Sequence, residues 1–429
     1  MTTYPAPGRL ATGSVPEPDL EELRELVAAE TELGDHPHAV EVRSNIPVYD
    51  GKQLVAALRT IEASGSDVEA ARSALRAEWG AVLGDGAGIL VVTGAFDIDV
   101  VDRVTTALTA LVERQRAAGG ASGDHFAKPG ANDRVWNALE KLAVDDAEAF
   151  VDYYGNEMLA LASESWLGPA YQVTSQVNAV NPGGAAQTVH RDYHLGFLTE
   201  EVAARYPAHV HRLSPLLTLQ GAVAHVDMPV ETGPSRYLPH SQKLLSGYLA
   251  WQRPEFAAYF EERQVQLPLS KGDAVFFNPA VFHAAGTNRS TDVRRMANLL
   301  QVSSAFGRAM ESVDRRRVVS AIYPSLLRLH QEAQSRPGPP PLAGWARRRD
   351  PRIDPRLNNA IAAAAEGYPF PTDLDLDPPV EGLAPASQAD LVREALASES
   401  TSEELAVRLQ EYADRRGADQ GSTRVTAKE

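Results

Sequence analysis

Three residues of this chain match by type the ligand set of a non-haem iron site. His190 and Asp192 are separated by one residue, and His283 lies much further along the chain. Two histidines and one carboxylate are the facial triad that non-haem Fe(II) oxygenases use. Alternate residues of a strand point to the same face, so one short strand can present His190 and Asp192 to the same metal ion. We predict that these three residues bind a metal and are catalytic.

The His-x-Asp spacing occurs twice in the chain, so the spacing alone is not specific. The second copy is His225 and Asp227. His225 ends an apolar strand expected over 216–226, and Asp227 leads into a loop, where a turn-forming carboxylate is more typical than a ligand. His190 instead follows a Gly-rich turn and begins a polar stretch. We favour His190 and Asp192, and a hydrogen-bonded His beside a turn Asp is the alternative interpretation of either copy.

Two arginines begin the apolar strand that we expect after His283. Arg294 and Arg295 precede the run Met296–Val302. An Arg that enters an apolar strand needs an anionic partner if it is buried, and a guanidinium can hold a carboxylate through two parallel hydrogen bonds. Neighbouring residues of a strand point to opposite faces, so only one of the two can face a given site. A solvated Arg at the strand start, and a surface His in a loop for His283, are the alternatives.

Composition narrows the class of protein. The 429 residues include no cysteine, which excludes disulfides, iron–sulfur clusters, thiolate zinc sites and a cysteine nucleophile. The formal net charge of −16 argues against nucleic acid and anionic membranes as partners. No apolar run approaches the roughly 18 residues of a membrane span, and the N-terminus lacks the pattern of a secretory signal. We therefore expect a cytoplasmic protein with a small-molecule substrate; the sequence predicts no particular oligomeric state.

The pattern of secondary structure changes twice along the chain. Helical periodicity dominates up to Gly168, apart from a short buried strand at Gly88–Thr93. Short strands separated by turn residues then predict an antiparallel sandwich or barrel up to Phe306. Helices return after this point, followed by a Pro-rich linker at 336–341 and a tail that we expect to be disordered. The predicted strands of the central region are Tyr171–Val180, Gln187–Leu195, Leu216–His225, Gln264–Leu267, Asp273–Phe277 and Arg294–Ser303.

The order of these motifs resembles the phytanoyl-CoA dioxygenase family of Fe(II)/2-oxoglutarate oxygenases. The resemblance covers about residues 88–306. Two departures from the family pattern affect a loop more than the ligands: Glu-Thr-Gly-Pro stands where Glu-Asn-Gly-Pro is frequent, and Pro-His-Ser where Pro-Gly-Ser-His is frequent. The segments that carry the resemblance are Gln187–Asp192, Val226–Pro234, Leu238–Gln242, Lys271–Phe277 and His283–Arg295.

The resemblance implies a fold and a division of the chain. The expected fold is a mainly β core with α decoration, a double-stranded β-helix (jelly-roll, cupin-like) flanked by N- and C-terminal helices. The expected parts are an N-terminal arm with helices (1–87), a jelly-roll oxygenase domain (88–306), and a C-terminal helical extension with the linker and tail (307–429).

The resemblance also implies a role for each candidate residue. His190, Asp192 and His283 would bind Fe(II), and Arg294 would hold the distal carboxylate of 2-oxoglutarate, with Arg295 as the second candidate. From their positions, three further polar residues are expected to contact the cosubstrate or to orient His190, and polar residues on a strand face are the equally weighted alternative. These three residues are Gln187, Thr188 and Asn178.

The expected activity is oxidation of a small molecule by O2, with Fe(II) as cofactor and 2-oxoglutarate as cosubstrate, which leaves as succinate and CO2. The presence of Asp192 favours hydroxylation, desaturation or ring formation, because related halogenases have Gly or Ala at this position. The Ala- and Arg-rich composition suggests bacterial specialised metabolism. A non-catalytic jelly-roll binding protein and a cupin-like metal-dependent isomerase or hydrolase are the alternative functions.

Overall fold

The computed structural model describes residues 13–117, 132–335, 353–379 and 382–416. The predicted Pro-rich linker, the tail beyond residue 416 and the first twelve residues of the N-terminal arm lie outside these ranges. Within them, no helix is both long and apolar enough to cross a membrane.

An eight-stranded sheet forms the centre of the described structure, in the order β1-β2-β3-β9-β6-β11-β5-β4. Strands β2 and β3 are parallel, and the other neighbours are antiparallel. A smaller sheet has the order β10-β7-β8. The bounds in the large sheet are β1 (Glu41–Arg43), β2 (Ile46–Asp50), β3 (Ile89–Thr93), β4 (Asn132–Val135), β5 (Gln172–Val180), β6 (Thr218–Ala224), β9 (Ala274–Phe277) and β11 (Arg295–Ser303), and in the small sheet β7 (Arg236–Leu238), β8 (Val265–Gln266) and β10 (Phe282–Ala284).

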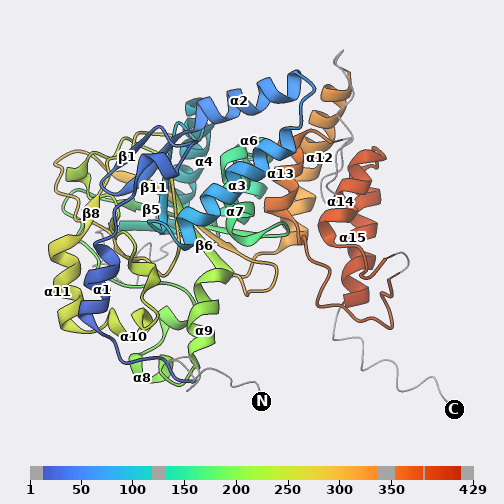
Figure 1. Ribbon diagram of the computed structural model, residues 1–429. Helices are drawn as coiled ribbons and strands as arrows, with labels where there is room; N and C mark the ends of the chain where they lie inside the picture. Colours follow the sequence, from blue (N-terminus) through green and yellow to red (C-terminus); the bar gives the residue numbers. More distant parts are fainter. Residues whose placement is uncertain (1–12, 118–131, 336–352, 380–381, 417–429) are drawn as a thin grey trace, which may run out of the picture.

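Helices cover one face of the large sheet and build the main apolar core there (Figure 1). They carry apolar residues at helical spacing on the buried side, as in α4, where Val101, Val104, Leu108 and Leu111 are buried. The helices before and within this layer are α1 (Leu20–Val27), α2 (Gly51–Ala63), α3 (Val68–Gly84), α4 (Ile98–Ala117), α5 (Ala138–Asp145), α6 (Ala147–Tyr154) and α7 (Glu157–Leu167).

The helices that follow α7 in the chain pack on two sides of the molecule. Short helices between the strands lie near α1, at the lower left of Figure 1, and the C-terminal helices pack beside α5 and α6. The C-terminal region therefore extends the same core instead of forming a second one. These elements are α8 (Glu200–Ala203), α9 (Ala208–Leu213), α10 (Gly247–Ala250), α11 (Pro254–Arg263), α12 (Arg315–Gln334), α13 (Pro355–Ala364), α14 (Gln388–Ala397) and α15 (Ser402–Arg416), with 3-10 turns η2 (Leu33–Asp35), η3 (His194–Phe197), η4 (Ser214–Leu217), η5 (Val230–Thr232) and η6 (Ser241–Lys243).

The other face of the large sheet is opposed by the small sheet. A separate apolar cluster, with Val91, Val275 and Leu267, lies between the two sheets. Tyr237 of β7 contacts Phe277 of β9 with ring centroids 5.2 Å apart, so the two sheets meet directly at this point. The space beside this contact is the cavity described below.

The fold class differs in one respect from the expectation. The protein is mixed α/β, with 49 % helix and 15 % strand, so "mainly β" understates the helical layers. The predicted strands are close to β3, β5, β6, β8, β9 and β11, except for Gln187–Leu195, and the sequence analysis missed β1, β2, β4, β7 and β10. Only His190 of that segment makes a β-bridge, with His283, and the positive φ angles of Tyr193 and His194 end the extended run. The predicted strand at Gln187–Leu195 is therefore wrong, although the segment is extended around the key residue.

Candidate metal centre

The β-bridge between His190 and His283 brings the two imidazoles together from distant parts of the chain. His190 N donates to His283 O at 2.9 Å, and His283 N donates to His190 O at 3.1 Å. The two rings are 4.4 Å apart between centroids. Asp192 completes the group, and one ligand atom from each of the three residues lies within 4.8 Å of the others. The three predicted ligands therefore converge, and His190 and Asp192 do so from an irregular segment.

Backbone carbonyls fix the orientation of both imidazoles. Nδ1 of His190 donates to Thr188 O at 2.8 Å, and Nδ1 of His283 donates to Val281 O at 2.9 Å. A carbonyl only accepts, so each Nδ1 carries the proton and each Nε2 presents a lone pair. The Nε2 atoms lie 3.9 Å and 3.5 Å from the carboxylate oxygens of Asp192. This arrangement is the one that metal-binding histidines require.

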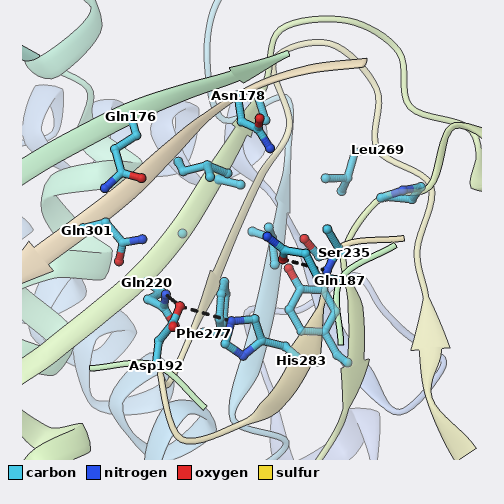
Figure 2. Close-up of a pocket in the computed structure, with 18 of the residues that line it drawn as sticks. Gln176, Asn178, Gln187, Asp192, Gln220, Ser235, Leu269, Phe277, His283 and Gln301 are labelled. Carbon is cyan, nitrogen blue, oxygen red and sulfur yellow. Dashed lines mark hydrogen bonds and ion pairs between the residues drawn. The ribbon is translucent and has the colours of Figure 1, made fainter. Parts of the chain in front are cut away.

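The carboxylate of Asp192 is held in its charged form. Burial alone would raise its pKa, but His190, His283 and a hydrogen bond from Gln220 hold the pKa well below its ordinary value. Nε2 of Gln220 donates to Oδ2 of Asp192 at 2.6 Å (Figure 2). An ionised carboxylate beside two imidazole rings fits a divalent cation.

Arg191 lies between two of the ligands and anchors their segment in the core. Its side chain is buried and donates to Leu244 O at 3.1 Å and to Ser241 O at 2.5 Å. The guanidinium also lies over the rings of Tyr248 and Phe282. These contacts fix the backbone of this segment. The side chain of Arg191 points to one side of that backbone, and the side chains of His190 and Asp192 point to the other side.

The triad opens into a cavity between the two sheets, and a buried Arg lines the same cavity. The side chain of Arg295 is 7 % exposed, and its Nη1 donates to Thr232 O and Gly286 O, both at 3.3 Å. Burial lowers the pKa of Arg295 to about 10. No carboxylate of the described residues pairs with it, and the buried hydroxyl of Tyr237 lies beside the same cavity. A buried cation of this kind calls for an anionic ligand.

Residues 84–296 match the family model described as phytanoyl-CoA dioxygenase (PhyH). The chain belongs to the phytanoyl-CoA dioxygenase family. It is therefore an enzyme of the non-haem Fe(II)/2-oxoglutarate class, with iron and 2-oxoglutarate as cofactors. The site fits both groups: the triad offers two imidazole nitrogens and a carboxylate, and Arg295 offers a guanidinium to a carboxylate.

Several solved structures are similar to the chain at low identity. The non-heme alpha ketoglutarate dependent epimerase SnoN from nogalamycin biosynthesis is 23 % identical over 55 % of this chain and 82 % of that chain, with a TM-score of 0.39. The carbocyclase SnoK from the same biosynthesis is 19 % identical over 51 % and 80 %, with a TM-score of 0.37. AviO1 from Streptomyces viridochromogenes Tue57 is 19 % identical over 55 % and 97 %, with a TM-score of 0.40. No curated protein matches the chain. These similarities are too low to support a conclusion about the reaction.

The structure places Arg294, the first candidate for 2-oxoglutarate, away from the cavity, and Arg295, the second candidate, in its lining. Nη2 of Arg294 donates to Oδ2 of Asp133 at 2.6 Å, and Arg294 does not line the cavity. Strand β11 begins at Arg295, whose side chain shares the cavity face with Ala297, Leu299 and Gln301. This alternation follows the strand period of two.

The three other predicted residues of this PhyH-family site lie in different places. Gln187 and Asn178 line the cavity. Oε1 of Gln187 accepts from Ala285 N at 3.2 Å, which ties its segment to the strand of His283. Thr188 is exposed and contributes its backbone carbonyl, which orients His190. His225, of the rejected copy, is buried on the other face of the sheet between Thr105 and Tyr153.

Sequence reasoning missed further residues of the PhyH-family cavity. Gln220 and Gln301 interrupt apolar strands, and counting alternate positions forward from Arg295 along β11 would have placed Gln301 on the cavity face, with Gln220 as its register partner. Tyr237 carried no such signal, because β7 is only three residues long and is recognisable only from its pairing with β10.

Proposed function

We propose that the protein uses Fe(II), 2-oxoglutarate and O2 to hydroxylate, desaturate or cyclise a small molecule, with succinate and CO2 as the other products. The observation that carries this proposal is that the triad and the buried guanidinium of Arg295 line one cavity. When bound, iron and 2-oxoglutarate supply the activation of O2, which no side chain of the chain can provide. The residues of the cavity bind and orient the reactants.

The role that we propose for each residue follows from its position in the cavity. His190, Asp192 and His283 would hold the iron, and the cavity beside them would take 2-oxoglutarate. Arg295 binds the far carboxylate of 2-oxoglutarate, because its buried guanidinium lines the cavity, whereas Arg294 is paired with Asp133. The hydroxyl of Tyr237 lies in position to donate to the same anion, since burial raises its pKa and keeps it protonated.

We also propose that the two facing sheets are the halves of a double-stranded β-helix spanning about 88–306. The flanks 1–87 and 307–429 would then be additions to it, although β1 and β2 of the first flank extend the large sheet beside β3. A cytoplasmic location and a place in bacterial specialised metabolism stay predictions from the sequence.

The test is anaerobic addition of Fe(II) and 2-oxoglutarate to the metal-free protein. A visible charge-transfer band is expected, lost in His190→Ala and kept in His225→Gln, which is the matched His of the rejected motif. Absence of the band, or an unchanged band in His190→Ala, would overturn the proposal. Succinate release with O2 then separates an oxygenase from a binding protein and from an isomerase or a hydrolase that works without 2-oxoglutarate.

A further inference from the structure

We propose that the part of the cavity on the Gln301 side of the metal centre binds an uncharged, hydroxyl-rich group of the sugar type, free or as the glycosyl part of a larger molecule. This inference rests on the proposed function, because it names the substrate class of the same site. It is carried by a juxtaposition of four side-chain amides, which line the cavity from three neighbouring strands (Figure 2). The four residues are Gln176 and Asn178 of β5, Gln220 of β6 and Gln301 of β11.

The sheet register makes these amides one continuous surface. Gln301 is the direct partner of Gln220 across β11 and β6. Gln176 and Asn178 alternate on β5, the other neighbour of β11, and therefore share one face. Residues opposite one another on neighbouring strands have Cβ atoms roughly 5 Å apart. A ligand on this surface meets several amides at once.

Two of the amides have unused hydrogen-bonding capacity. Gln301 is 7 % exposed, and its Oε1 is buried with no hydrogen-bond partner among the described residues. The Oε1 of Gln220 is also buried with no hydrogen-bond partner among the described residues, while its Nε2 donates to Asp192. Buried polar atoms normally have partners, so an acceptor without one, aimed into a cavity, indicates a ligand that donates. A hydroxyl group both donates and accepts, as an amide does, and therefore matches these groups.

The charges of the cavity are already matched, which favours an uncharged ligand. Asp192 belongs to the metal centre and Arg295 to the 2-oxoglutarate site. Nη1 of Arg134 donates to Oε1 of Gln176 at 2.9 Å, and its guanidinium lies 4.9 Å from the centroid of the Trp136 ring. A phosphate or a carboxylate on the substrate would compete with the amide and the ring for this guanidinium.

Aromatic and apolar side chains line the same cavity as the four amides. Phe197 lines it and is 57 % exposed, and Trp136 and Met310 line it as well. A sugar ring has hydroxyl groups at its edge and an apolar C–H face, which an aromatic ring can cover. The combination of amides with aromatic rings therefore fits a sugar better than it fits an acyl chain, which would leave the buried Oε1 atoms of Gln220 and Gln301 without partners.

The first test is binding of a panel of p-nitrophenyl glycosides, measured by calorimetry and saturation-transfer NMR. It is run on metal-free protein and on protein loaded anaerobically with Fe(II) and 2-oxoglutarate. At least one neutral glycoside is expected to bind, and glucose 6-phosphate and hexanoyl-CoA are expected not to bind. Tighter binding of the glycoside than of the free sugar identifies a glycosyl group, and equal binding a free sugar. Failure of the whole panel, or preference for a charged probe, would overturn the proposal.

The second test uses Gln301→Met, which keeps the size of the side chain and removes the amide. Glycoside affinity should fall at least tenfold while the melting temperature stays the same or rises, because the variant no longer buries an acceptor without a partner. A purely structural Gln would give lower stability with unchanged affinity, which contradicts the proposal. Gln172→Met on β5, outside the cavity, is the matched control and should keep full affinity. A charge-transfer band without glycoside binding rejects this inference alone, and binding without a band rejects the proposed function alone.

Discussion

Gln220 and Asp192 are joined by a 2.6 Å hydrogen bond that links the large sheet to the metal centre. Gln220 lies on β6, a regular strand, whereas Asp192 lies in an irregular segment. The rigid strand thus fixes one carboxylate oxygen of a ligand whose own backbone has little regular support. The same amide turns its oxygen toward the cavity, so one side chain contacts both the metal centre and the space for the substrate.

Replacing Gln220 with Leu should lower the affinity for Fe(II) by roughly 10- to 100-fold, since losing a group that orients a ligand typically has this effect. Anaerobic titration with Fe(II) measures it. Gln301→Met is the matched control, because Gln301 is the register partner of Gln220 and has no contact with the triad. Equal iron affinity in Gln220→Leu and the unmodified protein would show that Asp192 needs no such support.

The two neighbouring arginines of β11 provide a second comparison. Arg295→Gln should weaken 2-oxoglutarate binding by about 100-fold, because hydrogen bonds to a charged group contribute roughly 1.5–3 kcal/mol each. Arg294→Gln should leave that affinity unchanged and lower the free energy of unfolding by about 1 kcal/mol or less, since its partner Asp133 is also held by Arg116. Titration of the anaerobic iron complex with 2-oxoglutarate measures both. The opposite ranking would assign the cosubstrate to Arg294.

Arg294 and Arg295 also show how much of the site could be predicted from the sequence. The order of His190, Asp192, His283 and the arginines was enough to predict the ligands and the cosubstrate. It was not enough to choose between Arg294 and Arg295, because the choice depends on which face of β11 is turned to the cavity. That face is set by pairing with β5 and β6, and pairing is a property of the whole sheet.

The segment from Gln187 to Leu195 shows a different limit. Its composition predicts a strand, but only His190 forms a bridge, and Tyr193 turns away with a φ of 66°. The anchor that replaces strand pairing is the buried guanidinium of Arg191, held by carbonyls from residues far along the chain. A charged residue between two ligands gives no signal in the sequence that it will be buried.

The close approach of Gly247 to Arg191 gives a third prediction. A Cβ atom at position 247 would lie 1.9 Å from Cζ of Arg191, so one of the two must move. Gly247→Ala should lower the free energy of unfolding by about 1–3 kcal/mol, even though Ala favours a helix by about 1 kcal/mol over Gly. Denaturant unfolding measures the change. Gly34→Ala, where a Cβ meets nothing within 4 Å, is the control.

Removing the guanidinium tests whether this contact is the cause. In an Arg191→Met background, Gly247→Ala should cost less than it does alone, which a double-mutant cycle would detect as a coupling energy. Additive losses would mean that a contact other than Arg191 limits the size of residue 247. An equal loss in Gly34→Ala would mean that the loss does not come from a close approach.

The buried His225 predicts how stability depends on pH. Its Nδ1 and Nε2 lie 2.8 Å and 2.9 Å from the hydroxyls of Thr105 and Tyr153, and burial lowers its pKa from 6.5 to about 3. The unfolded chain therefore takes up a proton near pH 6.5 that the folded protein does not take up until about pH 3. The contribution of His225 to stability is complete above pH 6.5 and falls by about 1.4 kcal/mol per pH unit as the pH decreases through this window.

Denaturant unfolding of the unmodified protein and His225→Gln between pH 4.5 and 7.5 measures this contribution. The variant should be less stable at pH 7.5, because its amide cannot reproduce both hydrogen bonds, and its stability should decline less steeply on acidification, by the equivalent of about one proton. His209→Gln is the control, since it removes an exposed His and leaves the buried one in place. Parallel stability curves for the unmodified protein and His225→Gln would mean that His225 already carries its proton in the folded state.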